Sequence, residues 1–95
     1  MQHKITVLGL GYVGLPLARL FATKFPTVGF DINQSRVNEL NKGHDDTLEV
    51  SDDLLKAALV DNNPSKEEKG LYCSYDLEAI KDSNIYIITV PTPVD

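Results

Sequence analysis

The chain has 95 residues, a formal net charge of −5 and an isoelectric point near 4.8. This length allows one modest core, and the acidic balance argues against nucleic acid or an anionic membrane surface as the main partner. A single cysteine excludes an internal disulfide, and two well-separated histidines offer no metal-ligand spacing. We therefore expect a cytoplasmic protein without a metal site.

The first 25 residues predict a strand, a glycine loop and a helix. The apolar run 5–8 is followed by the sequence GLGYVG at residues 9–14 and then by a helix-like stretch to residue 25. The glycines, a proline and an arginine within this region argue against a membrane span or a signal peptide. The predicted helix face against the sheet consists of Leu17, Leu20, Phe21 and Phe25, which recur at helical spacing.

The three glycines of this loop meet different physical demands. Gly9 lets the chain turn sharply as it leaves the strand, and Gly14 lets the helix approach the sheet closely. Gly11 has no Cβ, so the N–H groups of Tyr12 and Val13 can come close to a pyrophosphate at the positive end of the helix. A strand-to-helix turn without a ligand is the alternative.

A second apolar strand, residues 27–30, ends at Asp31. A carboxylate at this place can accept hydrogen bonds from both hydroxyls of an adenosine ribose, and its charge repels a 2′-phosphate, so NAD is favoured over NADP. Arg36 could hold a phosphate in another geometry, but its position predicts the first turn of the next helix. Asp31 could instead serve as a turn or capping acid next to Asn33.

The rest of the chain continues the alternation of strands and helices that is typical of a parallel sheet. A second helix is expected over residues 34–42, with Asn33 as its cap, Gly43 as its end, and Val37 and Leu40 facing inward. A third helix is expected from Ser51 to about Val60, with a packing side formed by Leu54, Leu55, Ala58 and Leu59. The remaining predictions are a strand 71–74 with a buried Cys73, a short helix 76–80 and a strand 84–90.

The last predicted strand runs into the sequence VPTPVD, residues 90–95. Ligands of open parallel sheets lie beyond the carboxyl ends of the strands, so this loop should lie beside Gly9–Gly14. Thr92 would then offer its hydroxyl and its N–H to the cofactor. A rigid strand exit without ligand contact is the alternative.

The chain resembles the amino-terminal part of the UDP-glucose/GDP-mannose dehydrogenase family in three places. They are residues 9–18 (GLGYVGLPLA), residues 28–33 (VGFDIN) with Arg36 and Val37, and residues 90–93 (VPTP). Residues 47–50 and the following helix are similar to the branch that oxidises UDP-N-acetylhexosamines for capsular or Vi-type polysaccharide. The resemblance implies an enzyme that oxidises the sugar C6 alcohol to a carboxylate in two NAD-dependent steps through a thiol-linked intermediate.

The resemblance also implies roles for individual residues. It implies a pyrophosphate loop at Gly9, Gly11, Tyr12, Val13 and Gly14, a ribose acceptor at Asp31, a cofactor-side residue at Arg36, and contacts to adenosine and nicotinamide at Val90, Pro91 and Thr92. The family's nucleophilic cysteine, its helping lysine and asparagine, and its nucleotide-sugar site would lie after residue 95, and Cys73 does not match that cysteine. No catalytic residue is therefore assigned within the chain.

We expect residues 1–95 to be the amino-terminal portion of a dinucleotide-binding domain that has no turnover alone. Its fold should be a Rossmann-like α/β sheet flanked by helices but incomplete, the first half plus the fourth strand, with about four strands. The alternatives are a stand-alone dinucleotide-binding or regulatory module and part of a 3-hydroxyacid or 6-phosphogluconate-type dehydrogenase. The unpaired edge of a half-sheet leaves self-association open.

Overall fold

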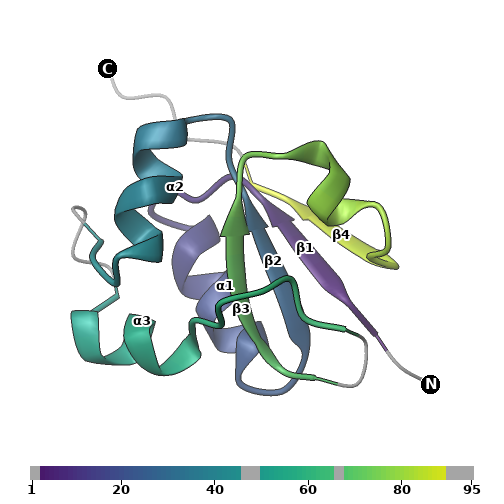
Figure 1. Cartoon of the computed structure of the whole chain (residues 1–95), viewed down its shortest axis with the longest axis horizontal. Coiled ribbons are helices and arrows are strands. Elements are labelled where there is room, and N and C mark those ends of the chain that lie inside the picture. The colour runs from purple at the N-terminus through teal and green to yellow at the C-terminus, as the bar shows by residue number, and fades with distance from the viewer. Residues whose placement is uncertain (1–2, 46–49, 66–67, 90–95) are drawn as a thin grey trace.

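The computed structural model describes residues 3–45, 50–65 and 68–89 (Figure 1). They form one sheet of four parallel strands in the order β3-β2-β1-β4, so the predicted α/β class and strand number are confirmed. The elements are β1 (Ile5–Leu8), α1 (Gly14–Ala22), β2 (Pro26–Phe30), α2 (Gln34–Asn41), α3 (Asp52–Ala58), β3 (Gly70–Ser74), the 3-10 helix η1 (Leu77–Ile80) and β4 (Ile85–Ile88).

One face of the sheet carries the main core, and all three α-helices contribute to it. Alternate strand residues such as Ile5, Val7 and Cys73 are at most 3% exposed and belong to one cluster with residues of α1, α2 and α3. Figure 1 shows these helices together beside the strands, with η1 on the other side of the sheet. The predicted inward positions Val37 and Leu40 on α2 and the burial of Cys73 are confirmed.

The predicted packing face of the first helix is wrong at Leu20, which is 58% exposed. The buried positions of α1 are instead Gly14, Leu15, Ala18 and Ala22. Gly14 fits where the start of α1 lies very close to the end of β1, and Leu15, Ala18 and Ala22 belong to the core cluster. Phe21 and Phe25 pack against the core but remain partly exposed.

The caps of the next two helices agree with the predictions from sequence. The side chain of Asn33 accepts a hydrogen bond from the N–H of Arg36 (3.1 Å), and that of Ser51 accepts one from the N–H of Leu54 (3.3 Å). α3 ends at Ala58, earlier than predicted, because the N–H of Val60 donates to the carbonyl of Leu71 on β3 (2.9 Å). Leu55 is buried, but the predicted packing position Leu54 is 48% exposed.

A buried ammonium group stabilises the amino end of the sheet. Lys4 is 1% exposed, and its Nζ donates to Asn63 Oδ1 (2.6 Å) and to both carboxylate oxygens of Asp82 (2.9 Å each). These bonds join the start of β1 to the loops that precede β3 and β4. Among the described residues, no helix has the length and apolar character needed to cross a membrane.

The strand order determines where a ligand can bind. The chain leaves β1 toward β2 and β3 on one side, whereas β4 pairs with β1 on the other side. In open parallel sheets, ligands bind at such a reversal, beyond the carboxyl ends of the two strands. The loop after β1 and the residues after β4 both lie at that point.

Candidate functional site

The glycine loop leaves β1 through a sharp turn. Gly9 has a φ of +102°, and its N–H donates to the carbonyl of Phe30 at the end of β2 (2.8 Å). A Cβ built on Gly14 would lie 1.7 Å from the carbonyl oxygen of Gly9, which is far inside van der Waals contact. The predicted turn at Gly9 and the close helix-to-strand approach at Gly14 are therefore confirmed.

The middle of the loop is open. A Cβ built on Gly11 meets no atom within 4 Å. In the described part of the chain, the N–H groups of Gly11, Tyr12 and Val13 donate to no acceptor, as expected at the beginning of a helix. These donors lie at the positive end of the dipole of α1, which is an environment that favours an anion.

Asp31 follows β2 and contacts the glycine loop. Its Oδ2 accepts a hydrogen bond from the N–H of Leu10 (2.9 Å), and its Oδ1 accepts one from the N–H of Asn33 (2.9 Å). A carboxylate offers about four acceptor positions, so these two bonds leave one free on each oxygen. The capping acid and the ligand acceptor, which the sequence left as alternatives, are compatible in this geometry.

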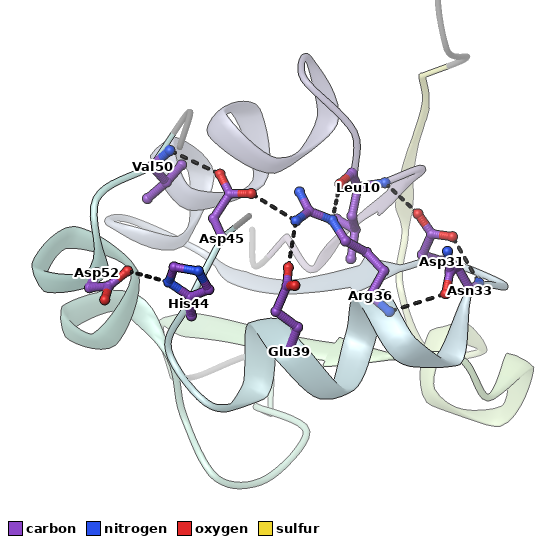
Figure 2. A network of polar contacts seen from close by, with 9 residues as sticks. All are labelled: Leu10, Asp31, Asn33, Arg36, Glu39, His44, Asp45, Val50 and Asp52. Carbon is purple, nitrogen blue, oxygen red and sulfur yellow. Dashed lines mark hydrogen bonds and ion pairs between the residues drawn. The ribbon is translucent and has the colours of Figure 1, made fainter. Parts of the chain in front are cut away.

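Arg36 lies in the first turn of α2, as predicted, and its side chain reaches back to the loop (Figure 2). Its Nε donates to the carbonyl of Leu10 (2.9 Å), so both polar backbone groups of Leu10 are held by side chains. The Nη1 of Arg36 donates to Glu39 Oε1 (3.0 Å) and to Asp45 Oδ1 (2.7 Å). Two carboxylates therefore share the charge of this guanidinium group.

Thr89 is a residue of the site that the sequence reasoning missed. Its N–H donates to the carbonyl of Leu8 (2.9 Å), and its hydroxyl lies 2.9 Å from the carbonyl oxygen of Gly9 and 3.1 Å from that of Leu8. A Cβ on Gly9 or Gly14 would meet the Thr89 hydroxyl oxygen within 2.8 Å. The sequence does place a hydroxyl residue, Thr89, within the predicted strand 84–90, but the predicted contact residue was Thr92.

These elements enclose a cleft of about 760 Å³, within the range of small-molecule sites. The cleft is largely apolar, and Ile32 (85% exposed) lies on its rim directly after Asp31. The lining residues are Leu8–Gly14, Phe30–Asn33, Arg36, Ile88 and Thr89. The structure thus brings together Gly9, Gly11, Tyr12, Val13, Gly14, Asp31 and Arg36, whereas Val90, Pro91 and Thr92 lie outside the described residues.

Cys73 has no place in this cleft. It is 2% exposed, and burial raises the pKa of its thiol to about 12, an effect that the charge of Arg36 only partly offsets. A thiol with such a pKa remains protonated at neutral pH and is a poor nucleophile. Among residues 3–45, 50–65 and 68–89, no three histidine, cysteine, aspartate or glutamate side chains are grouped so that they could hold a metal ion.

A family comparison identifies the domain. Residues 3–95 match the model described as the UDP-glucose/GDP-mannose dehydrogenase family, NAD binding domain. The chain belongs to this family. The predicted family and the predicted cofactor, NAD, are therefore confirmed for this NAD binding domain, and the cleft occupies the ligand position of a dinucleotide fold.

Relatives of this NAD binding domain are nucleotide-sugar dehydrogenases. The UDP-N-acetyl-D-glucosamine 6-dehydrogenase of Pseudomonas aeruginosa is 47% identical over 97% of this chain and 19% of its own length. A structure of the UDP-D-ManNAc dehydrogenase of Pyrococcus horikoshii superimposes with a TM-score of 0.76 at 35% identity, over 97% of this chain and 21% of that one.

A ternary complex of the GDP-mannose dehydrogenase of Pseudomonas aeruginosa gives a TM-score of 0.68 at 26% identity, over 96% of this chain and 20% of that one. The NAD binding domain thus spans about a fifth of the length of the relatives it matches. The similarity to enzymes of UDP-N-acetylhexosamines agrees with the branch predicted from sequence.

Proposed function

We propose that this chain is the amino-terminal NAD-binding part of a nucleotide-sugar 6-dehydrogenase and that NAD occupies the cleft at the carboxyl ends of β1, β2 and β4. The observation that carries this proposal is the open middle of the glycine loop. The free N–H groups of Gly11, Tyr12 and Val13 lie at the positive end of the α1 dipole. A Cβ on Gly11 would meet no atom within 4 Å, so a ligand can approach the backbone there. This arrangement suits a pyrophosphate.

In this proposal Asp31 binds the adenosine end of the cofactor. Its two free acceptor positions suit the 2′- and 3′-hydroxyls of the adenosine ribose, with Ile32 beside the adenine. A 2′-phosphate would face the charge of Asp31. Arg36 would offer that phosphate little compensation, because Asp45 and Glu39 already share its charge. NAD is therefore preferred over NADP.

The proposed division of labour leaves this chain with binding and orientation. The chemistry that bound NAD would supply is that of a hydride acceptor. The loop from Gly9 to Gly14 holds the pyrophosphate, Asp31 holds the ribose, and Val90, Pro91 and Thr92 would extend the wall toward the nicotinamide. The substrate class of the full enzyme is a UDP-N-acetylhexosamine or UDP-glucose, oxidised to the uronate by residues that follow this domain.

The cellular setting and assembly form part of the proposal as well. We place the protein in the cytoplasm, where NAD and nucleotide sugars are available, with no nucleic acid or membrane partner. A second copy of the chain remains a candidate partner through the sheet edge at β4. The similarity of the relatives favours this dehydrogenase function over a stand-alone regulatory module or a 3-hydroxyacid or 6-phosphogluconate-type dehydrogenase.

Isothermal titration calorimetry of the chain with NAD and with NADP tests the assignment. We expect NAD to bind more tightly by tenfold or more, a difference of roughly 1.4 kcal/mol, and Asp31→Asn to reduce this preference. Asp61→Asn changes the same charge at an exposed position and should leave both affinities unchanged. Equal or tighter binding of NADP would overturn the role of Asp31, and binding of neither nucleotide would overturn the assignment of the site to this chain.

A further inference from the structure

A buried carboxylate lies one contact away from the glycine loop. Asp45 follows α2 and is fully buried, although it lies outside the cleft. Its Oδ1 accepts a hydrogen bond from Arg36 Nη1 at 2.7 Å, and its Oδ2 accepts one from the N–H of Val50 at 3.1 Å. Burial of a charged carboxylate is costly unless it is paired and hydrogen-bonded, and both oxygens of Asp45 meet this requirement.

The partner of Asp45 connects it to the loop. Arg36 is 12% exposed at its side chain, and its Nε donates to the carbonyl of Leu10 at 2.9 Å. Figure 2 shows the resulting path from Val50 through Asp45 and Arg36 to Leu10, with Asp31 on the far side of the same loop residue. Leu10 itself is fully buried and lies between Gly9 and the open amides. A shift of this carbonyl therefore moves the adjacent Gly11 amide.

The position of the Arg36 guanidinium group is set by its hydrogen bonds to Leu10, Glu39 and Asp45, although this position leaves one of its nitrogens without a partner in the described part of the chain. Its Nη2 is buried and has no hydrogen-bond partner among the described residues. Native proteins rarely leave a buried donor unused, so the other contacts must hold the group at this position. Of the two carboxylates on Nη1, that of Glu39 is 22% exposed, whereas that of Asp45 is shielded from solvent and forms the shorter contact. Asp45 is thus the stronger constraint on Arg36.

We propose that Asp45 is a positioning residue of the dinucleotide site, which acts through Arg36 to hold the Leu10 carbonyl and hence the glycine loop in the conformation that receives the pyrophosphate. The inference rests on the proposed function for its effect on NAD binding. The restraint of the loop by Asp45 through Arg36 does not depend on any ligand. The chain thereby couples the segment after α2 to a loop that is more than 30 residues away in sequence.

A double-mutant cycle on NAD affinity tests the path. Asp45→Asn keeps the size of the side chain but removes its charge and places an amide N–H₂ against a donor, and we expect it to weaken NAD binding roughly tenfold. Arg36→Met removes the guanidinium group, so Asp45→Asn should have no further effect in that background. Asp61→Asn serves as the charge-matched control and should bind NAD like the unmodified chain.

Amide hydrogen exchange without NAD separates positioning from general stability. In Asp45→Asn the amides of Leu10 and Leu15, which donate to Asp31 and to the Gly11 carbonyl, should exchange about tenfold faster, whereas that of Val28 in β2 should not change. Equal acceleration at all three amides, or at none, would overturn the proposal.

Calorimetry distinguishes the two proposals. Unchanged NAD affinity in Asp45→Asn would overturn the positioning role while leaving the proposed function in place. An unmodified chain that fails to bind NAD would overturn the proposed function, and the exchange measurement would still decide whether Asp45 restrains the loop.

Discussion

At the scale of single residues, the three glycines of the loop have separate functions that the structure distinguishes by space. Gly14 has a backbone carbonyl 1.7 Å from the position of a Cβ, whereas Gly11 has nothing within 4 Å. The glycine pattern alone predicted this division, because a strand-to-helix turn at a pyrophosphate site needs both a close packing contact and an open approach. The two positions should therefore respond to substitution in opposite ways.

We predict that Gly14→Ala lowers the free energy of unfolding by about 3 kcal/mol, since α1 must move away from β1. Gly11→Ala should change it by less than about 1 kcal/mol, because its methyl group enters open space. NAD affinity should nevertheless fall at least tenfold in Gly11→Ala. Urea unfolding and calorimetry of both variants measure these effects.

A Gly11→Ala variant that binds NAD normally would show that the pyrophosphate does not approach this position. A stable Gly14→Ala variant would show that the contact between α1 and Gly9 can relax at little cost.

At the scale of elements, β4 is joined to the glycine loop by more than the sheet. Thr89 follows the last ladder residue of β4, and both its N–H and its hydroxyl contact carbonyls of the chain leaving β1. The sequence predicted that residues 90–95, which lie outside the described residues, are beside the loop through Thr92, and it kept Thr89 within the last strand. The contact of Thr89 depends on the register of β1 with β4, which pairs Leu8 with Ile88 and is not visible in the sequence.

We predict that Thr89→Val, which keeps the shape of the side chain but removes the hydroxyl, lowers the free energy of unfolding by about 1 kcal/mol. Thr89→Ser retains the donor and should preserve the contact to Gly9. Urea unfolding of the two variants compares them directly. If Thr89→Ser and Thr89→Val lower the free energy of unfolding equally, the hydroxyl does not contribute to stability.

At the scale of the whole molecule, the local sequence pattern predicts the order of helices and strands, but it does not predict which face of each helix is buried. Asn33 and Ser51 were identified correctly as helix caps because capping depends on neighbours within one turn. The spacing predicts Leu20 and Leu54 in the core, yet they are 58% and 48% exposed, because spacing alone does not indicate which side of a helix its neighbours cover. Asp45 gave no signal, since its partner Arg36 lies on another element.

Burial of Cys73 in this core makes the stability of the fold depend on pH above the pKa of an exposed thiol. Its thiol has a pKa of about 12 in the folded chain and about 8.5 when unfolded, so both states retain the proton below pH 8. Above the unfolded pKa the unfolded state loses its proton first, and stability falls until the folded pKa is passed, by up to about 1.4 kcal/mol per pH unit.

We therefore predict that the unmodified chain loses stability more steeply than Cys73→Ala as the pH rises from about 9 toward 12. Urea unfolding at a series of pH values gives both curves, and the variant subtracts the titration of lysines and tyrosines. Parallel curves would contradict the role of the buried thiol.

The double anchoring of Leu10 has a consequence for the kinetics of cofactor capture. Asp31 holds its N–H and Arg36 holds its carbonyl, so the loop is already shaped before a ligand arrives. A preorganised loop loses little conformational entropy on binding and requires no slow rearrangement after encounter. We therefore expect capture of the cofactor by the unmodified chain to be limited by diffusion into the cleft, and a variant that loses this double anchoring to capture the cofactor more slowly.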